Sequence, residues 1–147
     1  AIEGLPEFLA TISQEYTKRI LPDFLPEGTK VAFRVWAVSQ WAGDFNPIHI
    51  HDSNLSGVCF LKIPPKFEEE YAKEDHHPTA GCLEFIGSVP NHFARHSFLA
   101  KPEVGDFYIF PSWLTHQVYP FRSEGERRSM AFNVHFTAEN PVKGLNV

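Results

Sequence analysis

Short stretches rich in β-branched and aromatic residues, separated by glycine, proline or polar turns, occupy most of this 147-residue chain. The longest stretch, Lys30 to Trp41, alternates Val31, Phe33, Val35 and Ala37 with other residues, as expected of a strand. Further short strands are expected at Gly57 to Ile63, Cys82 to Ile86, His96 to Ala100, Asp106 to Phe110, Thr115 to Tyr119 and Ser129 to Thr137. Such a succession of strands indicates a mainly β fold.

A single helix is expected before the strands. Leu5 to Ile20 carries apolar residues at spacings of three and four with polar residues between them, and Pro22 ends the pattern. The chain has 43% hydrophobic and 14% aromatic residues, which is enough for a sizeable core. It shows no internal repeat, low-complexity tract or linker. We therefore predict one domain over residues 1–147, mainly β with an N-terminal helix.

Charge and cysteine content exclude several classes of function. A net charge of -5 gives no basic surface for phosphates, so we expect no nucleic-acid partner. No apolar run approaches the roughly 20 residues that cross a bilayer, and the amino terminus lacks a basic segment followed by an apolar one. Cys59 and Cys82 both have apolar neighbours, which favours buried reduced thiols over a disulfide. We expect a cytoplasmic protein with no membrane partner.

Three histidines are candidate metal ligands. His49 and His51 are separated by one residue, so their side chains point to the same face if the backbone is extended. His116 follows a strand and a tight turn that would bring it back across the mouth of a barrel. Taken alone, the pair His49 and His51 is typical of surface histidines on an exposed strand, and His116 is typical of a hydrogen-bonded histidine. Together they predict a site for a first-row metal on a rigid β scaffold.

A second pair of histidines, His76 and His77, lies in the charged stretch Lys66 to Pro78. Neighbouring residues on a strand face opposite ways, and a pair in a loop has no fixed geometry. We expect this stretch to be a solvated loop without a metal.

Arg127 and Ser129 are candidates for binding an anion. Strand alternation predicts that they project together, whereas Arg128 faces the other way into solvent. A guanidinium offers a planar fork for a carboxylate, and a nearby hydroxyl adds another donor, which suits the far end of a dicarboxylate. The alternative for Arg127 is a surface ion pair with Glu124 or Glu126.

These motifs resemble those of 2-oxoglutarate and Fe(II)-dependent oxygenases, specifically a small group with His-x-His and Phe-Pro-Ser-Trp-Leu-x-His patterns. The matching segments are His49-Ile50-His51, Ser56-Gly57-Val58, Phe110 to His116 and Glu126 to Ser129. The resemblance extends from Val31 to Phe136. It implies a double-stranded β-helix, or jelly roll, with iron at its open end.

The resemblance also implies an activity. His49 and His116 would bind the iron, and Arg127, helped by Ser129, would bind the distal carboxylate of 2-oxoglutarate. The 2-oxo acid end would chelate the iron beside O2. The expected reaction is oxidative decarboxylation of 2-oxoglutarate coupled to hydroxylation, or a related oxidation, of a small molecule or a protein side chain. The protein holds the ligands and excludes water while the metal carries the redox chemistry.

One position departs from the family's pattern. Its members usually carry His-x-Asp or His-x-Glu, so that two histidines and one carboxylate hold the metal, whereas this chain has His51. Strand geometry favours His51 as the third ligand, and the charge balance of the oxidised metal favours Asp52. We predict His51. A shell of three neutral imidazoles would also admit nickel, cobalt or zinc.

Two other functions are compatible with the same residues. One is a cupin-like three-histidine enzyme that does not use 2-oxoglutarate, in which Arg127 would be dispensable. The other is a non-catalytic metal-binding or sensing domain, which would form no succinate. Two copies of the chain could also pair through their edge strands to form a homodimer. Four aromatic residues near the motifs are expected in the core: Phe107, Tyr108, Phe110 and Trp113.

Overall fold

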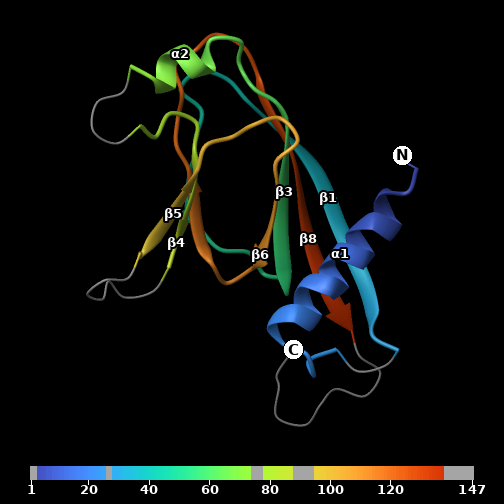
Figure 1. Ribbon diagram of the computed structural model, residues 1–147. Helices are drawn as coiled ribbons and strands as arrows, with labels where there is room; N and C mark the ends of the chain where they lie inside the picture. Colours follow the sequence, from blue (N-terminus) through green and yellow to red (C-terminus); the bar gives the residue numbers. More distant parts are fainter. Residues whose placement is uncertain (1–2, 26–27, 74–77, 88–94, 138–147) are drawn as a thin grey trace.

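Two four-stranded antiparallel sheets face each other in a jelly roll, as Figure 1 shows. The computed structural model describes residues 3–25, 28–73, 78–87 and 95–137. The first sheet has the order β1 (Lys30–Gln40), β8 (Arg127–Thr137), β3 (Leu55–Lys62) and β6 (Phe107–Pro111). The second has the order β2 (Asn46–His49), β7 (Thr115–Val118), β4 (Leu83–Ile86) and β5 (Ser97–Ala100). The predicted mainly β jelly roll is confirmed.

Helix α1 (Leu5–Ile20) covers the outer face of the first sheet and has the bounds predicted from the sequence. Its buried Leu9 belongs to a cluster with Phe132, Val134 and Phe136, which occupy alternate positions of β8. Arg127, Ser129 and Ala131 belong to the opposite row of β8 and line a pocket inside the jelly roll. Strand β8 therefore contributes one row of side chains to the packing with α1 and another row to the interior of the jelly roll.

The predicted strands are present with small shifts of their ends, and one strand was missed. Strand β2 begins at Asn46 and Pro47, which are typical of a turn. It lies at the edge of the second sheet, where proline is tolerated because one side of the strand makes no ladder hydrogen bonds. The turn-like start hid a strand that carries His49.

The stretch Lys66 to Pro78 differs from the solvated loop that we predicted. Its first part forms the short helix α2 (Phe67–Tyr71), and Phe67 is fully buried against Ala80 and Phe121. The three glutamates that follow Phe67 make the segment polar in sequence, although Phe67 itself packs in the interior. His76 and His77 lie outside the described residues.

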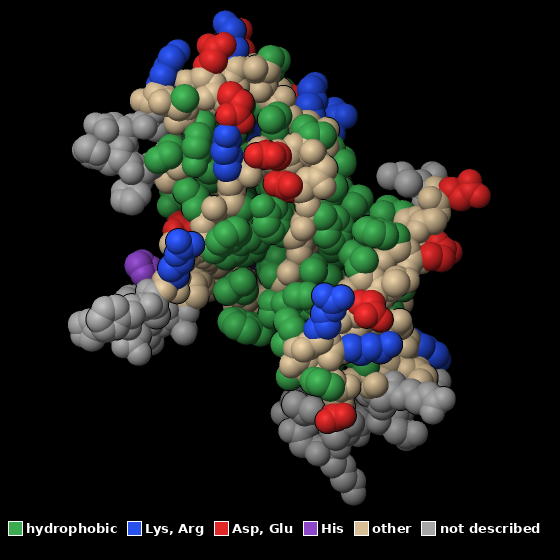
Figure 2. Space-filling model, viewed as in Figure 1, with side chains coloured by type: hydrophobic (Ala, Val, Ile, Leu, Met, Phe, Trp, Pro, Cys, Tyr) green, Lys and Arg blue, Asp and Glu red, His purple; other side chains and the backbone are tan. Residues whose placement is uncertain are grey.

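Surface features agree with the sequence where the structure describes them. On the face in Figure 2, Lys and Arg side chains alternate with Asp and Glu, and hydrophobic side chains occupy the centre. Cys82 is buried as expected and Cys59 only partly so, and neither forms a disulfide within the described residues. Within the described residues, no helix has the length and apolar character needed to cross a membrane.

Gly57 is the point of closest approach between β3 and its neighbours. It is paired with Phe132 on one side and Ile109 on the other. A Cβ atom at this position would overlap the Phe132 ring and lie 2.7 Å from the carbonyl oxygen of Tyr108. The sheet therefore requires a residue without a side chain here.

We expect Gly57→Ala to lower the free energy of unfolding by about 1–3 kcal/mol, because the methyl group overpacks this crossing. Urea unfolding followed by circular dichroism measures the change. Adding Phe132→Leu should restore part of the loss, since it removes ring atoms that the methyl group meets. A single variant as stable as the parent would contradict this account of the packing.

Candidate metal centre and anion site

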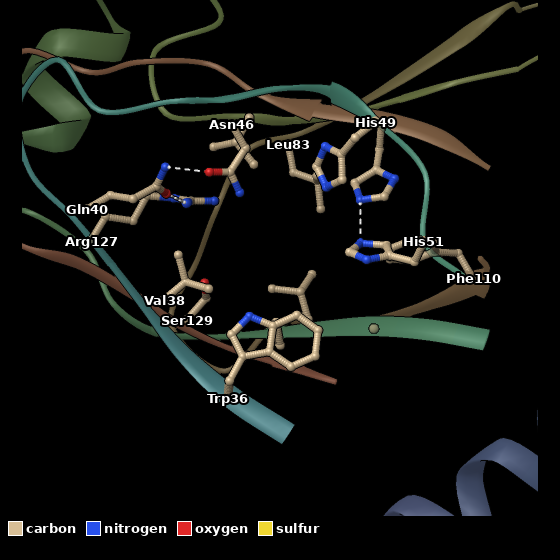
Figure 3. A pocket seen from close by; sticks show the side chains of 15 residues that line it. Trp36, Val38, Gln40, Asn46, His49, His51, Leu83, Phe110, Arg127 and Ser129 are labelled. Atoms are coloured by element: carbon tan, nitrogen blue, oxygen red, sulfur yellow. Dashed lines mark hydrogen bonds between the residues drawn. The ribbon is translucent and has the colours of Figure 1, made fainter. Parts of the chain in front are cut away.

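The three predicted histidines lie together. Ligand atoms of His49, His51 and His116 are all within 4.8 Å of one another. His49 ends β2 and is the register partner of His116 on β7, so strand pairing brings these two rings together. His51 lies beyond the end of β2, and its backbone N–H donates to the carbonyl of Ser112 at 3.0 Å. Figure 3 shows the cluster at one end of a pocket.

Hydrogen bonds to the backbone orient two of the rings. Nδ1 of His49 lies 2.6 Å from the carbonyl oxygen of Pro47, and Nδ1 of His116 lies 2.8 Å from that of Leu114. The tautomer with a proton on Nδ1 satisfies both contacts and leaves the lone pair on Nε2. Nε2 of His116 faces Nε2 of His51 at 3.1 Å. Two ring nitrogens at this separation can share a proton or a metal ion.

Burial favours the neutral form of two histidines of this cluster, His51 and His116. It lowers the pKa of His116 to about 4, and the positive charge that His49 and His51 can carry contributes to the shift. The pKa of His51 is also lowered, first by burial and then by His49. Neutral imidazoles are the form that binds metal, so these two rings need lose no proton near pH 7.

The stability of the metal-free protein should fall as the pH falls from about 6.5 to about 4. In this range the unfolded chain binds a proton at His116 and the folded chain does not, so acid favours unfolding. Urea unfolding at several pH values measures this, with His116→Asn as the control, which should show a smaller fall. Parallel profiles for the two proteins would contradict the assignment.

The structure distinguishes His51 from Asp52. Asp52 is exposed, and among the described residues no carboxylate belongs to the histidine cluster. The only donors that the cluster offers are imidazole nitrogens. The geometry therefore agrees with the choice of His51, whose role as a ligand stays a prediction.

A buried serine network fixes the loop that carries His51. Ser112 Oγ lies 2.5 Å from Ser53 Oγ and 2.8 Å from Ser56 Oγ. Ser56 donates to Oδ1 of Asn133 on β8 at 2.9 Å. The network joins the loop before β3 to the turn between β6 and β7, which leads to His116. The sequence offered the motif Ser56-Gly57-Val58 but no sign of this contact.

Arg127 and Ser129 point into the same pocket, at its other end from the histidines. Arg127 is only 2% exposed and Ser129 is also buried. Arg128 is on the surface, where it donates to Glu126 at 2.8 and 2.9 Å. The surface ion pair that was the alternative for Arg127 is thus formed by its neighbour. Strand alternation predicted both orientations correctly.

The guanidinium of Arg127 has a neutral partner and an unused donor. One terminal N–H donates to Oε1 of Gln40, and Nε has no hydrogen-bond partner among the described residues. The ring of Phe60 lies 5.0 Å from Cζ. Burial lowers the pKa of Arg127 to about 10, so it remains charged at neutral pH. A buried cation that lines a pocket and forms no ion pair with a described residue is suited to a carboxylate.

The pocket between the two groups has a volume of about 80 Å³. A cavity of this size holds several water molecules, which a small organic acid could displace. Trp36, Val38 and Gln40 line it at alternate positions of β1. These three residues belong to no sequence motif, and the alternation that predicted the strand was that of the opposite row, Val31, Phe33, Val35 and Ala37. Trp113, expected in the core, is 70% exposed, whereas Phe110 is in the core.

Comparisons with known proteins assign the chain to a class. Residues 34–133 match the family described as "Putative 2OG-Fe(II) oxygenase". The chain therefore belongs to the 2-oxoglutarate and Fe(II)-dependent oxygenases, enzymes whose cofactors are iron and 2-oxoglutarate. The comparison with curated proteins found no match.

Solved structures agree with this fold. A Pseudomonas putida prolyl-4-hydroxylase is 19% identical with a TM-score of 0.58, covering 92% of this chain and 68% of its own. A Burkholderia pseudomallei oxidoreductase of the 2OG-Fe(II) oxygenase family is 15% identical with a TM-score of 0.55, covering 88% and 56%. HygX from Streptomyces hygroscopicus, with nickel and 2-oxoglutarate bound, is 10% identical with a TM-score of 0.51, covering 88% and 67%. The chain spans little more than half to two thirds of these proteins.

Proposed function

We propose that this chain is a non-haem iron dioxygenase that couples oxidative decarboxylation of 2-oxoglutarate to oxidation of a second substrate. His49, His51 and His116 would hold the metal, and Arg127 with Ser129 would hold the distal carboxylate of 2-oxoglutarate. The observation that carries the proposal is one pocket with three clustered histidines at one end and a buried, uncompensated arginine at the other.

The side chains at the two ends of the pocket fit iron and 2-oxoglutarate. Imidazoles suit iron and equally nickel, cobalt or zinc. The backbone carbonyls of Pro47 and Leu114 accept hydrogen bonds from Nδ1 of His49 and His116. Histidines that bind a metal through one ring nitrogen commonly donate from the other in this way. At the other end, the guanidinium of Arg127 and the hydroxyl of Ser129 line the pocket, where both could donate hydrogen bonds to carboxylate oxygens.

Iron with bound 2-oxoglutarate supplies the oxidising chemistry, and the chain's residues position the reactants. Arg127 fixes the distal carboxylate, which directs the 2-oxo acid end toward the histidines. Val38, Leu83, Phe110 and Val118 form apolar walls between the two ends and limit the entry of water. No side chain of the pocket is assigned a role as general acid or base.

The second substrate is a small molecule or a protein side chain. The similarity to a prolyl-4-hydroxylase supports testing peptidyl proline early. Ile48, Ile50 and Trp113 are exposed apolar side chains on the segments that carry the three histidines. We further propose a single domain over residues 1–147. We also propose a cytoplasmic location, which is supported by two cysteines that form no disulfide within the described residues. A homodimer is compatible with the position of β1 at the edge of its sheet.

Succinate formation tests the proposal. Protein loaded with Fe(II) in air should convert 2-oxoglutarate to succinate above the rate of the metal-free protein, even without a second substrate. Peptides containing proline, followed by small metabolites, should then raise this rate. Metal binding without any succinate would contradict the proposal.

The all-histidine cluster favours one second candidate, a cupin-like enzyme that does not use 2-oxoglutarate. In that enzyme Arg127 would have no cosubstrate to bind. Its activity would therefore survive Arg127→Leu, whereas the activity of a 2-oxoglutarate oxygenase would not.

A further inference from the structure

We infer that Gln40 is a positioning residue of the anion site: its neutral side chain orients Arg127 and leaves the arginine's charge to the carboxylate that enters the pocket. The inference rests on the proposed function, because it assigns that carboxylate to 2-oxoglutarate. It concerns a residue that neither the sequence motifs nor the comparisons single out.

The contacts of Gln40 hold its side chain at both ends. Gln40 is 4% exposed at the end of β1 and is the register partner of Arg127 at the start of β8. Its Oε1 accepts a hydrogen bond from Arg127, and its Nε2 donates to Oδ1 of Asn46 at 3.3 Å. Figure 3 shows the three side chains beside one another. Asn46 begins β2, which ends at His49, so these hydrogen bonds link the anion site to the strand of a candidate metal ligand.

Charge is the property that distinguishes Gln40 from the usual partner of a buried arginine. Buried cations are generally paired with carboxylates, because an isolated charge is costly to remove from water. The amide of Gln40 accepts a hydrogen bond as a carboxylate would, but it adds no negative charge. Within the described part of the chain, Arg127 forms no ion pair with a carboxylate. The neighbouring Glu126 is engaged with Arg128 and Lys62.

The remaining contacts of Arg127 limit how its guanidinium can turn. Phe60 lies against it, with Cζ 5.0 Å from the ring centroid, and Gln40 holds one terminal nitrogen. Nε, which has no partner among the described residues, belongs to a residue that lines the pocket. An entering carboxylate would therefore meet a guanidinium whose orientation is set by Gln40 and Phe60 and whose charge no described carboxylate shares.

Gln40→Glu separates charge from geometry. A glutamate has nearly the same shape and can accept the same hydrogen bond from Arg127, and Asn46 can turn its amide to donate to it. The new carboxylate would neutralise Arg127 and repel the ligand. Calorimetric titration of Mn(II)-loaded protein with 2-oxoglutarate should show a dissociation constant raised by roughly 10- to 100-fold. The Mn(II) dissociation constant and the midpoint of thermal unfolding should stay close to those of the parent.

Gln14→Glu is the matched control, because it adds the same charge on α1, away from the pocket. Unchanged 2-oxoglutarate affinity in a folded Gln40→Glu variant would overturn the inference. If that variant does not fold, Gln40→Met removes the orienting acceptor without adding charge and should raise the dissociation constant by about 3- to 10-fold; an unchanged value there would overturn the inference equally. Failure of the parent protein to bind 2-oxoglutarate is a different result, and it would overturn the proposed function together with the inference.

Discussion

Arg127→Leu is expected to weaken 2-oxoglutarate binding by about 2–5 kcal/mol, the usual effect of removing one partner from a buried, hydrogen-bonded charge pair. The corresponding rise in the dissociation constant is roughly 30-fold to several thousandfold. The effect is large because Arg127 is only 2% exposed and its Nε has no hydrogen-bond partner among the described residues. Metal affinity should be unchanged, since the histidines lie at the other end of the pocket. Calorimetric titration of the Mn(II)-loaded variant measures both constants.

Arg128→Leu is the matched control for this prediction. It removes the same charge one position along β8, but its side chain is exposed and is bound to Glu126. It should bind 2-oxoglutarate as the parent does. Equal losses in the two variants would mean that Arg127 acts through general charge and not through a specific contact. If Arg127→Leu bound 2-oxoglutarate as tightly as the parent does, the assignment of Arg127 to an anion site would be wrong.

His51→Ala is expected to weaken metal binding by about 100-fold or more. The loss of a ligand should exceed the roughly 10- to 100-fold effects of mutating residues that only support ligands. His49→Ala and His116→Ala should behave similarly, because the three rings form one cluster. Competition with a chelating dye, measured for Co(II) and Zn(II), gives the affinities.

Asp52→Ala decides between the two candidates for the third ligand. Asp52 is exposed and lies outside the cluster, so its removal should leave metal affinity within about twofold of the parent, as expected of a surface substitution. If His51→Ala bound metal tightly and Asp52→Ala bound it weakly, the loop would have to rearrange so that Asp52 supplies a carboxylate.

Strand β8 shows what periodicity alone can predict. Alternation placed Arg127 and Ser129 on one face and Arg128 on the other, and the structure has the same arrangement. The prediction succeeds because a strand's two faces are fixed by backbone geometry. It required no knowledge of which strands are neighbours.

The histidines show where that reasoning ends. The residues that the sequence selected do lie together, but β2 ends at His49, so strand alternation does not place His51. A backbone hydrogen bond to Ser112 and the serine network around it do so instead. These contacts join segments that are distant in sequence, and the spacing of residues carries no information about them.

Gln40 was missed for a related reason. A glutamine at the end of a strand has no charge and belongs to no motif, and only the pairing of β1 with β8 brings it beside Arg127. Trp113 was wrongly expected in the core because its aromatic character was weighed without its place at the tip of a turn. In both cases tertiary position decided the role of the side chain.

An anaerobic titration of the metal-free protein with Fe(II) and then 2-oxoglutarate tests the central claim most directly. Chelation of the metal by the 2-oxo acid gives a visible metal-to-ligand charge-transfer band, which reports both groups bound in one pocket. We expect the band in the parent protein, no band in His116→Ala, and a band that needs much more 2-oxoglutarate in Arg127→Leu. Tight binding of Fe(II) with no band at any 2-oxoglutarate concentration would contradict the assignment of this pocket to an oxygenase.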